Sequence, residues 1–114
     1  MEQQPAEVVE NRIFRALADP TRRALLTSLH RKAQSVGELT AQFDMTQSAV
    51  SQHLKVLREA SIVEERKAGR LRVYQFRPEG LLLARDWLDQ HVEFWASRLE
   101  NLGAHLRKNH GSKD

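Results

Sequence analysis

The sequence predicts a mainly α-helical fold that carries one small β-hairpin. Two observations support this class: apolar residues recur at helical spacing over most of the chain, and residues 62–76 alternate between apolar and charged side chains around a glycine. The chain has 114 residues, 40% hydrophobic and 6% aromatic residues and no cysteine. We therefore expect one domain, residues 1–114, with an aliphatic core and without disulfides or thiolate metal sites.

Several classes of protein do not fit this composition. No apolar run approaches the roughly 18 to 20 residues that a membrane-spanning helix needs, and the first residues lack the basic and apolar regions of a signal peptide. The sequence shows no nucleophile with a nearby base, and the five glycines are scattered rather than gathered in a phosphate-binding loop. We expect a cytoplasmic protein that has no membrane partner and is not an enzyme.

Two helices are expected before residue 30. Residues 7–17 carry apolar side chains at helical spacing, including Val9 and Ile13. Asp19 and Pro20 then mark a helix start, because Asp caps free backbone N–H groups and proline suits the first helical position. This second helix is expected to run to about Leu29.

The next two helices are expected to form a helix-turn-helix. Ser35 followed by Glu38 fits a capping box, which opens a short third helix. After a short break, Thr46 is a suitable N-cap for a fourth helix that runs to about residue 60. Two helices joined by so short a turn form a helix-turn-helix. In the fourth helix one apolar stripe must be buried, and it consists of Val50, Leu54 and Leu57.

Residues 62–67 and 71–76 are expected to pair as a β-hairpin, because Gly69 accepts the positive φ of a tight turn. The hairpin would form a wing over about residues 62–77. Four cations cluster near its tip: Arg66, Lys67, Arg70 and Arg72. Alone they could be a solvated edge that prevents aggregation, but beside a helix-turn-helix they favour contact with DNA phosphates.

A last helix is expected over about residues 79–106, roughly 28 residues and about 42 Å long. Its apolar residues recur every seventh position, as in a coiled coil. Such a helix outreaches a small core, so we expect a homodimer to which the first helix also contributes. The candidate dimer residues are Val9, Ile13, Leu81, Leu88, Val92, Trp95, Leu99, Leu102 and Leu106. The polar tail, residues 107–114, is expected to be disordered.

Three stretches of the chain carry recognisable motifs: residues 14–26 (FRALADPTRRALL), residues 48–60 (SAVSQHLKVLREA) and residues 69–74 (GRLRVY). In this order they resemble the second-helix signature, the recognition helix and the wing of one known family, the ArsR-type winged helix-turn-helix repressors. The resemblance covers roughly residues 10–80 without a gap. It implies a winged helix-turn-helix fold with long dimerisation helices at both ends, and a homodimeric bacterial repressor that binds an inverted-repeat operator in double-stranded DNA.

The resemblance also implies which side chains meet the DNA. By position, those facing bases would be Gln47, Ser48, Ser51 and Gln52. Contacts to the DNA backbone would come from the wing and from cations on the fourth helix. The resemblance places Arg70 and Arg72 on the flanking backbone. From their charge or position in this sequence, the further candidates are Thr46, Lys55, Arg58, Arg66 and Lys67. His53 lies to the side of the exposed face, so we expect it to pack between helices or contact the backbone rather than read a base.

The sequence departs from the family at both of its metal sites. Residues 35–39 hold no cysteine where metal-sensing members carry thiolates. The positions matching the C-terminal zinc ligands are Pro78, Gly80, His91 and Phe94, which offer one ligand where zinc wants four. We therefore expect no metal and no cofactor. One alternative is a constitutive repressor, whose activity depends only on its own concentration.

Two other functions stay open as well. Trp87 and Phe94, seven residues apart, could line an apolar pocket near the C-terminal helix, which would make the chain a sensor of a small-molecule effector that the sequence does not identify. Alternatively, the long helix could bind another protein while DNA binding is residual. The polar and basic surface of the helix-turn-helix argues against this second alternative.

Overall fold

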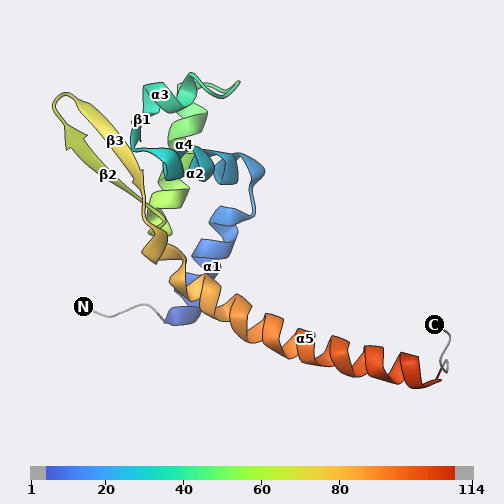
Figure 1. The fold of residues 1–114 in the computed structure, drawn as a ribbon. Helices are drawn as coiled ribbons and strands as arrows, with labels where there is room; N and C mark the ends of the chain where they lie inside the picture. The colour runs from blue at the N-terminus through green and yellow to red at the C-terminus, as the bar shows by residue number, and fades with distance from the viewer. Residues whose placement is uncertain (1–4, 110–114) are drawn as a thin grey trace. The chain divides into compact units, whose positions relative to one another are not determined.

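The computed structural model describes residues 5–109, and it describes side chains as far as residue 103. It is mainly helical with a small antiparallel sheet, as predicted (Figure 1). The elements are α1 (Ala6–Leu17), α2 (Pro20–Arg31), β1 (Gln34–Ser35), α3 (Val36–Thr40), α4 (Gln47–Glu59), β2 (Val63–Ala68), β3 (Leu71–Phe76), the 3₁₀ helix η1 (Pro78–Leu81) and α5 (Leu82–Asn109). The chain divides into two compact units, Met1–Ala84 and Arg85–Asp114.

The predicted caps fix where α2, α3 and α4 begin. The side chain of Asp19 accepts a hydrogen bond from the N–H of Arg22 (3.0 Å), which satisfies a free donor of α2. Ser35 and Glu38 form the reciprocal capping box of α3. Thr46 accepts from the N–H of Ala49 (3.1 Å) at the start of α4. These local interactions set where each helix of the helix-turn-helix begins.

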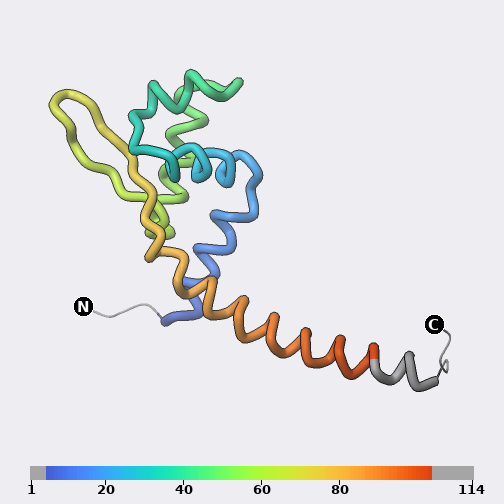
Figure 2. The backbone as a smooth tube through the Cα atoms, in the orientation of Figure 1, coloured from blue at the N-terminus to red at the C-terminus, as the bar shows by residue number. Residues whose placement is uncertain are grey.

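The sheet has the order β1-β3-β2, so β3 is its central strand. In the hairpin, Gly69 adopts the expected positive φ of 65°, and the register pairs Ala68 with Leu71 and Glu65 with Tyr74. The strand β1 was not predicted; it pairs with residues 73 and 74 of β3. The tube in Figure 2 shows the hairpin extending from the helices of this unit.

The core of the first unit takes apolar side chains from α1, α2, α3, α4 and the start of β2. The predicted stripe of α4 is fully buried, with Val50, Leu54 and Leu57 each 0% exposed. Ile13 is only 1% exposed within the same core, so it cannot offer surface to a second chain, and we remove it from the candidate dimer interface. Val9 and Leu81 are partly buried against this core.

The connection from α4 into β2 depends on an unusual backbone. Ser61 adopts a positive φ of 62°, and the N–H groups of Ser61 and Ile62 bond to the carbonyls of Arg58 and Leu57, the pattern that closes a helix C-terminus. Gly80 of η1 lies against this turn, and a Cβ built on it would meet the carbonyl oxygen of Ser61 at 2.0 Å. Only glycine fits there without moving backbone.

The C-terminal helix differs from its predicted bounds at both ends. Residues 78–81 form η1, and the α-helix starts at Leu82 rather than at residue 79. It continues to Asn109, past the end predicted at Leu106, whose side chain lies outside the described residues. The remainder of the predicted disordered tail, residues 110–114, lies outside them too. Over the described part of the chain, no helix combines the length and apolar character that a bilayer span requires.

Replacing Gly80 by Ala is expected to lower the free energy of unfolding by about 1–3 kcal/mol, because the new Cβ must displace the backbone at Ser61. Urea unfolding followed by circular dichroism measures the change. Gly37→Ala is the matched control: its Cβ would lie 3.9 Å from the nearest side-chain atom, so it should be neutral or stabilising by up to about 1 kcal/mol. Equal effects of the two substitutions would contradict the close approach at Gly80.

Candidate nucleic-acid interface

The helix α4 presents two chemically different faces. Its apolar stripe faces the core, whereas the polar side chains predicted to meet bases are exposed: Gln47, Ser48, Ser51 and Gln52. Lys55 and Thr46 are exposed as well, although the hydroxyl of Thr46 already accepts a hydrogen bond as the N-cap. The helix therefore offers hydrogen-bonding groups without burying any of them.

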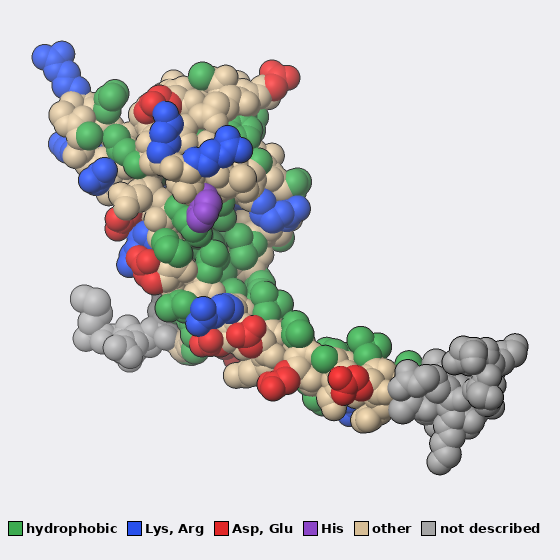
Figure 3. All heavy atoms as spheres, viewed as in Figure 1, with side chains coloured by type: hydrophobic (Ala, Val, Ile, Leu, Met, Phe, Trp, Pro, Cys, Tyr) green, Lys and Arg blue, Asp and Glu red, His purple; other side chains and the backbone are tan. Residues whose placement is uncertain are grey.

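Basic side chains extend this surface along the hairpin. Figure 3 shows Lys and Arg side chains at the tip of the hairpin and on the neighbouring helices. Arg66, Lys67 and Arg70 are exposed, and within residues 5–103 none of them, nor Lys55, forms an ion pair. These four cations are available to an anionic partner such as a phosphate backbone.

Two other cations that were expected to contact DNA are held by a carboxylate that the sequence pattern does not single out. Glu65 on β2 accepts hydrogen bonds from Arg58 of α4 (3.0 Å) and from Arg72 of β3. The hydroxyl of Tyr74, opposite Glu65 in the register, donates a third at 2.6 Å. The Glu65 side chain is 15% exposed. This cluster, which we call the Glu65 cluster (Glu65, Arg58, Arg72 and Tyr74), joins the end of α4 to both strands of the hairpin.

The cluster keeps Glu65 ionised. The hydrogen bond from Tyr74 is the largest influence and lowers the pKa of the Glu65 carboxyl; burial opposes it, while Arg72 and Arg58 lower the pKa further. Burial, together with the bond to Glu65, raises the pKa of Tyr74, which stays a neutral donor at physiological pH. The hairpin register around Gly69 was the signal that could have found the cluster, because it places residue 65 opposite residue 74.

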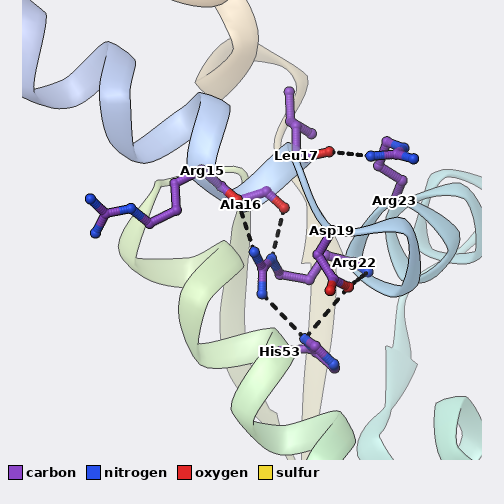
Figure 4. Close-up of polar contacts among 7 residues, drawn as sticks. All are labelled: Arg15, Ala16, Leu17, Asp19, Arg22, Arg23 and His53. Carbon is purple, nitrogen blue, oxygen red and sulfur yellow. Dashed lines mark hydrogen bonds and ion pairs between the residues drawn. The ribbon is translucent and has the colours of Figure 1, made fainter.

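A second polar cluster holds α4 against the first two helices (Figure 4). The Arg22 guanidinium donates to the carbonyl oxygens of Ala16 (2.7 Å) and Arg15 (2.8 Å) in the last turn of α1, where carbonyls have no partner one helical turn on. Its third nitrogen lies 3.4 Å from Nδ1 of His53, which is also 4.0 Å from the carboxylate of Asp19. His53 therefore packs between helices, one of the two roles expected for it.

In the second unit, α5 exposes the apolar row predicted for dimerisation. The described members of the row are 46–64% exposed in the single chain: Leu88, Val92, Trp95, Leu99 and Leu102. Single exposed apolar residues are common on protein surfaces, but a continuous row along one helix is typical of an interaction surface.

The two aromatic side chains considered as an effector pocket, Trp87 and Phe94, each contact a different ring on α5. Trp87 stacks on His91 with 3.9 Å between ring centroids, whereas Phe94 packs edge-on against Trp95 and beneath Arg98. A hollow beside Phe94 is lined by residues of α5 alone and does not include Trp87.

His91 contacts the carbonyl oxygen of Trp87 at 2.8 Å, and over the described residues no three His, Asp or Glu side chains are placed to hold a metal ion.

Comparison with known proteins gives one consistent family. A family profile described as a helix-turn-helix domain matches residues 17–66. The HTH-type transcriptional regulator Rv2034 of Mycobacterium tuberculosis is 46% identical over 89 residues, which is 78% of this chain and 80% of that protein. The transcriptional repressor SdpR of Bacillus subtilis is 27% identical over 78 residues, 68% of this chain and 87% of that protein.

A solved structure supports the same grouping. The crystal structure of the ArsR family transcriptional regulator RHA00566 is similar to this chain with a TM-score of 0.69 and 37% sequence identity. The similarity covers 75% of this chain and 94% of that one.

The Glu65 cluster makes stability depend on pH in a defined direction. Because the pKa of Glu65 is lowered from its ordinary value of 4.5, the ionised carboxylate stabilises the fold above that value, and this contribution is lost as pH falls through the lower folded pKa. Glu65→Gln is expected to cost about 1–2 kcal/mol at pH 7 and progressively less on acidification towards pH 3. Urea unfolding at a series of pH values measures this difference.

The control is Glu64→Gln, which neutralises an exposed neighbour on the same strand and should stay within about 0.5 kcal/mol at every pH. A cost of Glu65→Gln that did not change with pH would show that the ionised carboxylate is not what stabilises the cluster.

Proposed function

The chain belongs to the ArsR-type family of winged helix-turn-helix transcriptional regulators, and on this premise we propose that it is a homodimeric repressor of an inverted-repeat operator. The observation that carries the proposal is the exposed polar face of α4 beside a wing whose cations are available. An α-helix fits the major groove of B-DNA, where each base pair presents a distinct set of donors and acceptors. The name of the relative SdpR supports repression rather than activation.

Sequence preference would come from the first turns of α4. Gln47 and Gln52 carry amides that can pair in bidentate fashion with adenine, whereas Ser48 and Ser51 accept several bases. All four side chains are exposed, which supports this role, because they can reach a base without breaking a contact in the protein core. Affinity would come mainly from phosphate contacts by Lys55, Thr46 and the wing, and would fall with added salt.

The homodimer would be built on the apolar row of α5. A second copy of the same row offers the matching surface, and symmetric pairing places two recognition helices on two half-sites about one helical turn of DNA apart. Val9 and Leu81 are only partly buried in the first unit, so they stay candidates for contact with a second copy. Leu106 would extend the row.

Gln52→Ala is expected to weaken binding to a duplex selected in vitro by the wild-type protein by about 5- to 150-fold, while binding to scrambled DNA changes little. Arg70→Ala should weaken both duplexes alike and reduce the salt slope of log K by about 0.9, because a lost phosphate contact carries no sequence information. Fluorescence anisotropy at several salt concentrations separates the two results. Equal losses for Gln52→Ala on both duplexes would remove this residue from base readout.

Leu99→Glu is expected to shift the protein from dimer to monomer, because it places a carboxylate in the apolar row at a position that is 64% exposed in the single chain. Sedimentation equilibrium measures the change, and circular dichroism checks that α5 stays helical. Ser97→Glu introduces the same charge two residues away, on another face of the helix, and should leave the dimer intact. A wild-type protein that sediments as a monomer at tens of micromolar would contradict the homodimer.

A further inference from the structure

Glu65 is an anion inside the surface that is proposed to meet DNA. Its carboxylate bonds to Arg58 at the end of the recognition helix and to Arg72 on the wing, both of which were expected to contact phosphates. At neutral pH the carboxylate is charged, so it both occupies these guanidinium groups and repels a nearby phosphate.

The carboxylate is held in place, whereas the arginines can move. Tyr74 is 7% exposed and donates to Glu65 at 2.6 Å from the opposite strand, which fixes the acidic group against the sheet. The side chains of Arg58 and Arg72 are 45% and 62% exposed, so their ends can turn from Glu65 to a phosphate without disturbing the core. Each arginine bonds to Glu65 through one guanidinium nitrogen, so a phosphate that binds these arginines competes with Glu65 for their charge and orientation.

We propose that Glu65 is a specificity-determining residue that restrains Arg58 and Arg72 on non-cognate DNA and releases them to phosphates on a cognate site. The proposal rests on the proposed function, since it assumes that α4 and the wing bind DNA. On a cognate site, base contacts hold the phosphates close enough to compete with Glu65; on random DNA, the phosphates are not held in register. Lys55, Arg66, Lys67 and Arg70 supply the non-specific attraction.

The test removes the charge while keeping the size and an acceptor oxygen, with Glu65→Gln. Binding is measured by fluorescence anisotropy on a scrambled duplex and on a duplex selected in vitro by the wild-type protein, each at several salt concentrations. On scrambled DNA we expect affinity to rise about tenfold at low salt and the salt slope to steepen by about one to two, as one or two additional phosphate contacts form. The selected duplex should gain less, so the ratio of the two affinities should fall at least about threefold.

Glu64→Gln is the matched control, because it removes the same charge from the adjacent position of β2. Glu64 is 49% exposed and lies 3.7 Å from Arg77 rather than beside Arg58 or Arg72. It should change binding to either duplex by less than about threefold and leave the slope unaltered, as a distant, screened charge does. Equal effects of the two variants would overturn the proposal.

A double variant tests whether the effect of Glu65 depends on the two arginines. In the double variant Arg58→Gln/Arg72→Gln, adding Glu65→Gln should no longer tighten scrambled DNA; an undiminished effect would overturn the proposal. Glu65→Met, an uncharged variant suited to a largely buried position, should shift affinity in the same direction as Glu65→Gln and serves if the amide destabilises the fold. A wild-type protein that binds both duplexes equally would contradict the proposed function itself, whatever Glu65 does.

Discussion

The burial of one stripe of α4 is the constraint on which the rest of the structure depends. Val50, Leu54 and Leu57 are fully buried, and removing such side chains from water supplies about 1.5–3 kcal/mol each. Their burial sets the rotation of the helix about its axis, because side chains three and four residues apart share a face. With the stripe inside, the four polar residues of the first turns must point outward. The chemistry of the exposed face follows from the packing of the buried one.

Polar interactions then fix what the apolar stripe leaves undetermined, which is how the middle and the C-terminal end of α4 are held. At one side, Arg22 bonds to the last carbonyls of α1 and approaches His53, so three helices meet at one guanidinium. At the C-terminal end, Glu65 joins Arg58 to the wing. These contacts are ionic or charge-assisted and lie near the surface, and they hold α4 in one orientation against the other elements.

Much of this could be predicted from the sequence because the signals are local. The caps at Asp19, Ser35 and Thr46 and the turn at Gly69 need only a few neighbouring residues, and each is confirmed. What escaped prediction depends on contacts between distant segments: the two-residue strand β1 exists because β3 lies beside it, and Ile13 is buried by the other helices of its unit. In the candidate site, the exposure of the polar face followed from helical periodicity, whereas the partners of Arg58 and Arg72 depended on hairpin register.

The most direct test of the account is a fluorescence-anisotropy titration of the wild-type protein against DNA from upstream of its own gene, beside scrambled DNA, at two salt concentrations. If α4 reads bases from a symmetric dimer, the upstream DNA should be preferred by about a thousandfold or more, with two subunits bound per site. Equal and steeply salt-dependent binding to both DNAs would contradict base readout at this site and leave only electrostatic attraction to the phosphate backbone.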